Sequence, residues 1–111
     1  MGSFHWVWVL IGAPVAEEVI FRRGLHEALL RGLFFDRARE PLRANLVTAI
    51  AFAAAHWLVR PGYLSLLTFF PALVIGAMFN RYRRLDLCIV GHAVFNLFWL
   101  VGASRVVGRL E

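Results

Sequence analysis

The sequence predicts an all-α protein: a polytopic membrane bundle of about four transmembrane helices, in a single domain spanning residues 1–111. Hydrophobic residues make up 60% of the chain, well above the ~45–50% typical of soluble domains. Charged residues make up 17%, against about 25% in soluble domains. Four apolar segments approach the ~20 residues that a helix needs to cross a bilayer, and a chain of 111 residues has the length of one domain.

The first segment, about residues 4–34, is expected to form one extended helix with an amphipathic second half. Its apolar front runs from Trp6 to Ile20. Pro14 is expected to kink this helix or to restart it one turn before Glu17. The second half is expected to carry apolar side chains on one face, namely Phe21, Leu25, Ala28 and Leu29. The charged side chains are expected to point mostly away from that face, namely Arg22, Arg23, Glu27 and Arg31.

Three further helices are expected at about residues 42–59, 63–82 and 85–101. The helix at 42–59 is rich in alanine, and small residues allow helices to approach closely in lipid. Pro41 suits the first turn of that helix. The tripeptide Arg60-Pro61-Gly62 is a turn signal between the next two.

The arginine distribution predicts a topology. The net charge of +5 comes without any lysine, and the connectors at 35–44 and 81–84 hold most of the arginines in loops. The positive-inside rule therefore puts both connectors in the cytoplasm, with the N-terminus, the 60–62 turn and the C-terminus outside. Because no basic stripe with interleaved aromatics appears, membrane lipid rather than nucleic acid is the expected partner. Cys88 is the only cysteine, so it is expected to be a buried structural thiol.

Strongly polar residues are few within the apolar segments, and they recur at helical spacing. A charge held in hydrocarbon costs at least ~2.5–3.5 kcal/mol, so such residues usually face inward and mark a functional site. An acid precedes a base by four residues at Glu18 and Arg22, the favourable order for a pair. His92 and Asn96 are also four apart and share a helix face. Glu17 and His56 complete a set that three helices would bring to one cavity.

The chemistry that this set allows is amide hydrolysis. A carboxylate and a histidine can hold and deprotonate water as a general base. A second histidine and an asparagine amide can donate hydrogen bonds to the developing oxyanion. No serine, threonine or cysteine is placed to act as a nucleophile; the spacing of Cys88 and His92 would permit a thiolate pair, but nothing else supports one.

Two alternatives remain at this point. Two histidines and a glutamate also suit a zinc-dependent membrane metalloprotease with water as the fourth ligand, although the chain has no HExxH motif and asparagine is a poor zinc ligand. A non-enzymatic immunity or scaffold protein could bind a partner helix in the same cavity. Individually, Glu18–Arg22 could be a structural ion pair and His56 a core histidine.

These residues form three motifs of a known family, EExxxR, FxxxH and HxxxN. They read Glu17-Glu18-Val19-Ile20-Phe21-Arg22, Phe52-Ala53-Ala54-Ala55-His56 and His92-Ala93-Val94-Phe95-Asn96. The chain resembles the CPBP intramembrane glutamic proteases, the CAAX-protease and bacteriocin-processing (Abi) family, which includes endopeptidases of the Ras-converting-enzyme type. Arg23 stands between Arg22 and Gly24, where the family continues directly to glycine, and this inserted arginine touches no catalytic position.

The resemblance implies a role for each matching residue. Glu17 would be the catalytic carboxylate that activates water together with His56. His92 and Asn96 would form the oxyanion site. The supporting residues would be Glu18, Arg22 and Phe52, with the first two orienting the site and Phe52 packing beside it. Since adjacent helical positions point about 100° apart, the division of work between Glu17 and Glu18 depends on which one faces the histidines.

The resemblance also implies an enzyme without a cofactor or an essential metal. Its substrate would be a peptide or protein, cleaved near the C-terminus or a membrane-proximal part and possibly marked by a C-terminal sorting or lipid-modified signal. Short bacterial members resemble the processing enzymes of such sorting systems, and the expected location is the bacterial cytoplasmic membrane. The chain covers the core of the family, because longer members have additional helices before the first motif.

Overall fold

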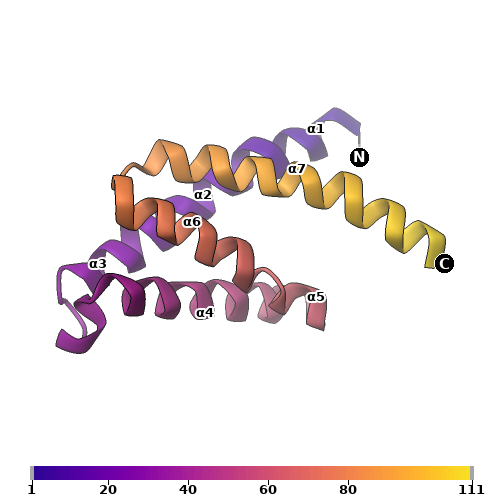
Figure 1. Ribbon diagram of the computed structural model, residues 1–111. Coiled ribbons are helices and arrows are strands. Elements are labelled where there is room, and N and C mark those ends of the chain that lie inside the picture. The colour runs from indigo at the N-terminus through magenta and orange to yellow at the C-terminus, as the bar shows by residue number, and fades with distance from the viewer. Residues whose placement is uncertain (1, 111) are drawn as a thin grey trace.

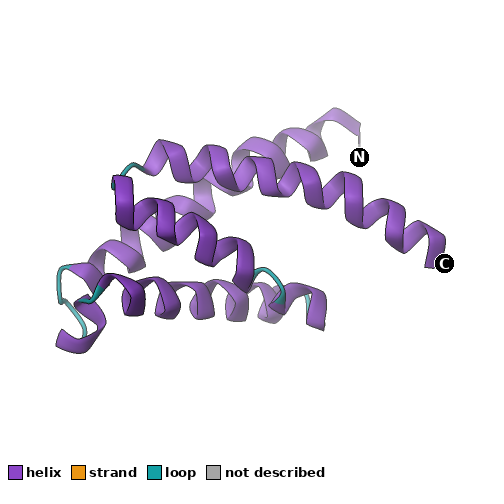
Figure 2. Cartoon of the chain, viewed as in Figure 1, coloured by secondary structure: helices purple, strands orange, loops and turns teal. Residues whose placement is uncertain are grey.

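The computed structural model describes residues 2–110, with side chains described for residues 5–102. The described chain folds into four helical segments and contains no strand between residues 2 and 110 (Figures 1 and 2). The first segment consists of α1 (Gly2–Val7), η1 (Trp8–Gly12), α2 (Ala13–Glu18), η2 (Val19–His26) and α3 (Glu27–Leu30). The other elements are η3 (Asp36–Arg39), α4 (Pro41–Val59), α5 (Tyr63–Leu66), α6 (Phe69–Tyr82) and α7 (Leu85–Leu110). The predicted all-α bundle is confirmed.

Three helices are long and apolar enough to cross a membrane, over Pro41–Val59, Tyr63–Tyr82 and Leu85–Gly102. α6 packs between α4 and α7, α2 packs against α7, and η2 packs against α4. In Figure 1 the first segment runs behind the other three. The described chain measures 47 × 26 × 20 Å along its principal axes.

The first segment is one continuous helix whose geometry changes along its length. η1 and η2 are π-helical and flank the α-helical turn that holds the two glutamates. Pro14 lies in the first turn of α2, as expected for a restart, because proline has no N–H to donate to the preceding turn. The segment ends at Leu30 rather than Phe34, and Gly32 then adopts a left-handed conformation with φ 75°.

Arg22 departs from the expected amphipathic pattern. Its side chain is fully buried instead of pointing away from the core, whereas Arg23 is exposed as expected. Arg22 is held inside by Glu18 and by the carbonyl oxygen of Ala72. An internal partner for the charge thus overrides the hydrophobic pattern of the segment.

α4 is bounded by local signals that agree with the prediction. Glu40 caps its first turn, since its carboxylate accepts hydrogen bonds from the backbone N–H groups of Leu42 and Arg43 at 3.1 and 3.0 Å. Pro41 occupies the first turn. The close approach between α4 and α6 is made at Asn45, whose Nδ2 donates to the carbonyl oxygen of Leu73 at 3.0 Å.

The expected helix at 63–82 is interrupted. α5 ends at Leu66 and α6 begins at Phe69. Pro71 has no N–H to donate to the carbonyl of Leu67, and that carbonyl instead accepts the N–H of Phe70 in a tighter turn at 3.2 Å. α7 also differs from its predicted range, because it continues to Leu110 rather than ending at 101.

Both basic connectors lie at one end of the bundle, and the 60–62 turn lies at the other (Figure 1). His26 Nε2 is 2.8 Å from Asn80 Oδ1, and Asn80 Nδ2 donates to the Pro41 carbonyl at 2.9 Å. Arg83 pairs with Glu27 at the same end. These contacts join the ends of three helical segments, an arrangement consistent with the topology predicted from the arginines.

We expect Gly76→Ala to destabilise the protein by about 1–3 kcal/mol, as overpacking in a filled core typically does. A Cβ at Gly76 would lie 1.7 Å from Asn45 Oδ1, so Asn45 would have to move and lose its bond to Leu73. Thermal unfolding in detergent measures the effect. Gly91→Ala is the matched control, because its nearest atom, Met78 Cε, is 3.5 Å away. Equal melting temperatures for the two variants would contradict the prediction.

Candidate active site

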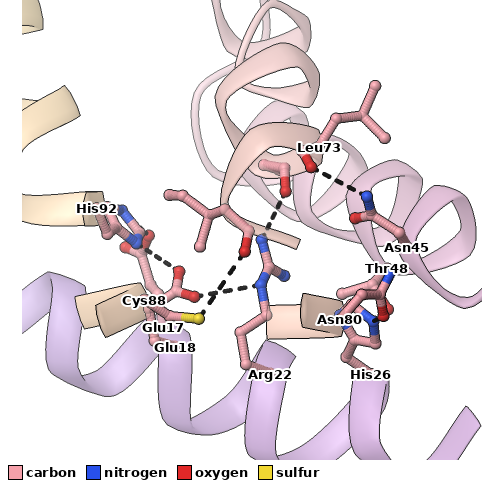
Figure 3. A network of polar contacts seen from close by, with 12 residues as sticks. Glu17, Glu18, Arg22, His26, Asn45, Thr48, Leu73, Asn80, Cys88 and His92 are labelled. Carbon is pink, nitrogen blue, oxygen red and sulfur yellow. Dashed lines mark hydrogen bonds and ion pairs between the residues drawn. The ribbon is translucent and has the colours of Figure 1, made fainter. Parts of the chain in front are cut away.

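Glu18 lies between His92 and Arg22 in the polar network shown in Figure 3. Its side chain is fully buried. Oε2 is 2.6 Å from His92 Nδ1, and Oε1 is 3.4 Å from Arg22 Nε. A carboxylate only accepts, so His92 donates from Nδ1. The carboxylate of Glu18 thus joins the first segment to α7.

Glu17 faces the histidines through one oxygen. Its Oε1 is 3.3 Å from His92 Nε2 and 3.5 Å from His56 Nε2. The side chain is 28% exposed, whereas that of Glu18 is completely enclosed. Adjacent glutamates therefore occupy different environments, one inside the bundle and the other between the two imidazoles.

His56 is oriented by its own helix. Its Nδ1 is 2.8 Å from the carbonyl oxygen of Phe52. Because a carbonyl accepts, Nδ1 carries the proton, and Nε2 of a neutral ring presents its lone pair toward Glu17. The Phe52 ring packs against both histidines, with centroid distances of 4.3 Å to His56 and 5.6 Å to His92. Phe52 thus lies beside the site, as the sequence predicts.

Arg22 connects the site to α6. Its Nη2 donates to the carbonyl oxygen of Ala72 at 2.8 Å, and its Nε faces Glu18 as an ion pair. The distance of 3.4 Å is not accompanied by hydrogen-bond alignment, because both Arg22 Nε and Glu18 Oε1 remain without a hydrogen-bond partner. The guanidinium therefore acts on Glu18 chiefly through its charge.

Asn96 is turned toward the first segment. Its Nδ2 donates to the carbonyl oxygen of Val9 at 2.8 Å, which ties α7 to η1. Asn96 also lines the cavity described below. One N–H of its amide is used by Val9, and the other is available to a second acceptor.

A cavity of about 590 Å³ opens beside these groups. Its polar lining comes from four residues that the sequence singled out, Glu18, His56, His92 and Asn96, together with Thr68. Most of the remaining wall is apolar and is supplied by α5, the start of α6 and α7, including Leu64, Pro71, Phe98 and Trp99. The arrangement is a small polar group at the side of an apolar chamber, a common form of ligand site.

Sequence reasoning missed two buried polar residues, Asn45 and Thr48. Both lie on α4 and are buried, and the Thr48 hydroxyl donates to the Ala44 carbonyl at 2.8 Å. Their spacing carried a signal: residues 45, 48, 52 and 56 follow one helix face at intervals of three or four. That face leads from the α4–α6 contact to His56.

Cys88 is buried, as expected for a structural thiol, and its Sγ lies 3.9 Å from the Ile75 carbonyl oxygen. The polar contacts of the His92 ring are with Glu17 and Glu18.

Among the described side chains, no group of three or more His, Cys, Asp and Glu residues is arranged to hold a metal ion.

Fold and site together define a class: a helical membrane protein in which carboxylates, histidines and an asparagine from three helical segments meet at one cavity. The family model described as type II CAAX prenyl endopeptidase Rce1-like matches residues 2–98. The chain therefore belongs to this family of membrane-embedded peptidases, which confirms the resemblance drawn from its motifs. Searches of curated proteins and of solved structures each found no match.

Arg22→Met should lower the free energy of unfolding by about 3–5 kcal/mol, because it leaves the buried Glu18 without its cationic partner. Chemical denaturation in detergent measures the change. Arg23→Met is the matched control, since the neighbouring arginine is exposed and removing it should change stability by less than about 0.5 kcal/mol. If the two variants unfold alike, the Glu18–Arg22 pair does not contribute as the burial implies.

Proposed function

We propose that the protein is a glutamic-type, metal-independent intramembrane endopeptidase. In this proposal Glu17 and His56 activate a water molecule, His92 and Asn96 stabilise the oxyanion, and Glu18, Arg22 and Phe52 support the site. The observation that carries the proposal is that Glu17 Oε1 lies 3.5 Å from His56 Nε2 and 3.3 Å from His92 Nε2, and that both histidines line the cavity.

The orientation of His56 supports its role as a base. Its Nδ1 is bonded to the Phe52 carbonyl, so the neutral ring has its lone pair on Nε2, next to Glu17. A water molecule bound between these groups would lose a proton to them as its oxygen attacks the substrate carbonyl carbon. The proton would then pass to the departing amine when the C–N bond breaks, which restores both groups.

Charge balance supports the role of His92. The cluster contains two carboxylates, Glu17 and Glu18, and one guanidinium, that of Arg22, which pairs with Glu18, so one further positive charge makes the cluster neutral. His92 has one ring nitrogen against each carboxylate, and a doubly protonated ring balances the charge. Its Nε2–H would then move from Glu17 to the oxyanion as negative charge develops there.

Asn96 would contribute the second donor. Its Nδ2 already donates one hydrogen to Val9, which fixes the plane of the amide. The other hydrogen would bond the substrate oxygen. Removing one such donor typically costs ~3–4 kcal/mol of transition-state stabilisation.

We further propose that the substrate is a peptide or protein whose cleaved bond lies near its C-terminus or a membrane-proximal part. The apolar cavity wall suits a lipid-modified or apolar residue beside that bond. The family description names CAAX prenyl endopeptidases, so a prenylated CAAX peptide is one candidate substrate, and a peptide with a C-terminal sorting signal is the other. The proposed location is the bacterial cytoplasmic membrane, with the two arginine-rich connectors in the cytoplasm.

Glu17→Gln should lower the rate of peptide cleavage about 10²–10⁴-fold, because the amide cannot accept the proton of water. The assay uses the full chain in liposomes with a farnesylated CAAX peptide, and with an unprenylated sorting-signal peptide. Asp86→Asn is the control, since this acid is exposed and pairs with Arg84 at the connector end. A folded Glu17→Gln protein that cleaves at the wild-type rate would contradict the proposal. Biological function without cleavage by either protein would favour a scaffold role.

The metal-independent mechanism predicts that a strong chelator leaves the cleavage rate unchanged and that purified protein holds no stoichiometric metal. Elemental analysis and a rate measured with and without chelator test this. One equivalent of zinc, together with loss of activity on chelation and its return on adding zinc, would instead favour the metalloprotease alternative.

A further inference from the structure

The end of the first segment exposes a run of large apolar side chains next to the arginine-rich connector. Leu33, Phe34 and Phe35 are 71%, 57% and 72% exposed. They lie at the bundle end where Arg83 pairs with Glu27 and Asn80 bonds Pro41. Aromatic side chains at that level are typical of the boundary between bilayer and water.

A second cavity, of about 760 Å³, lies between this run and the start of α4. Its apolar wall consists of Phe34 and Phe35 on one side and Leu46 and Val47 on the other. Leu46 and Val47 are partly exposed, and the outward face of α4 continues to Ile50, which is 59% exposed. The cavity therefore opens onto an apolar surface that leads toward the middle of α4.

The rim of the cavity is cationic. Arg37 and Arg43 line it, together with one acid, Asp36. Arg43 folds back over η3, with Nη1 3.5 Å from the carbonyl oxygen of Arg37. Within residues 5–102, neither arginine has a carboxylate at ion-pair distance, whereas Arg22, Arg83 and Arg84 do.

We propose that this cavity binds one anionic phospholipid from the surrounding leaflet. Arg37 and Arg43 would hold the phosphate, since guanidinium groups bond phosphate oxygens in a bidentate manner. An acyl chain would lie between Phe34 and Leu46 and continue along Val47 and Ile50. Basic pockets at the cytoplasmic end of helices are suited to such headgroups. The cationic rim would contact the anionic headgroup, and the apolar wall would contact the acyl chain.

This site is separate from the proposed active site. The two cavities share no lining residue. α4 supplies the wall of the lipid cavity near its N-terminal end and His56 near its C-terminal end. The lipid site therefore stands independently of the proposed catalytic mechanism.

The test is native mass spectrometry of the full chain in detergent, with equal additions of phosphatidylglycerol and phosphatidylcholine that have identical acyl chains. We expect preferential retention of one phosphatidylglycerol. Each arginine near an anionic lipid surface is worth about a fivefold change in binding, so R37Q/R43Q should weaken phosphatidylglycerol binding about 25-fold and should weaken the binding of phosphatidylcholine, whose headgroup has no net charge, by less. R60Q, at an exposed arginine of the opposite end, should bind like the wild type. Free glycerol phosphate should not displace the lipid, because it lacks the acyl chain.

Several results would overturn the proposal. Equal retention of the two lipids would show that the headgroup is not recognised, and an equal loss in R60Q would show only diffuse attraction between charges. Displacement by glycerol phosphate would make the site one for free phosphate.

A dimer that dissociates in R37Q/R43Q would assign the cavity to a second copy of the chain. Displacement of the lipid by substrate peptide would assign the cavity to substrate. R37K/R43K, which preserves the charge but not the bidentate geometry, should fold and bind phosphatidylglycerol more weakly than the wild type does; a folded R37K/R43K with the full wild-type affinity would contradict the bidentate contact.

Discussion

The buried carboxylate of Glu18 is the constraint on which the arrangement of the helices depends. A charge without any solvent contact is costly unless it is paired, and Glu18 is paired on both sides, by Arg22 from its own segment and by His92 from α7. Arg22 in turn reaches the backbone of α6 at Ala72. One carboxylate thus links the first segment to α6 and α7, and its burial requires all three to be in register.

The same register gives Glu17 its different surroundings. Because Glu17 and Glu18 point in different directions from the helix, burying Glu18 against Arg22 and His92 leaves Glu17 Oε1 between the Nε2 atoms of His56 and His92. Phe52 contacts both imidazoles and limits their movement. The pairing of Glu18 with Arg22 and His92 therefore fixes where Glu17 lies, and the side chain of Glu17 is the more exposed of the two.

α4 contributes residues to both cavities. Its N-terminal end is held by the Glu40 cap and by Asn80 at Pro41, close to the cavity we assign to lipid. Asn45, Thr48, Phe52 and His56 then follow the face that packs toward the bundle interior. A lipid bound at the start of α4 would hold the helix at the membrane surface and thereby fix the depth of His56, about four turns beyond Pro41.

Much of this protein was predictable because the relevant signals are local. Helices in a bilayer must satisfy their own backbone groups, so apolar length predicts them, and the fixed spacing of residues on a helix face predicts the pairs Glu18–Arg22 and His92–Asn96. Local chemistry also predicts the start of α4 at Pro41. The break between α5 and α6 in the third segment was not predictable in the same way. The segment is apolar throughout, so its composition does not indicate that Pro71 changes the turn before it.

The sequence by itself determined which segments are helical, where the arginine-rich connectors lie and which polar residues are too costly to face lipid. Only the tertiary structure decided that Arg22 points inward, that Glu18 rather than Glu17 bonds His92 Nδ1, and that Asn96 bonds the Val9 carbonyl. These outcomes depend on contacts between residues 50 to 87 positions apart in the chain. Helix periodicity predicts which side chains share a face. The partner of a buried charge depends on which other helix packs against that face, and the sequence does not show that.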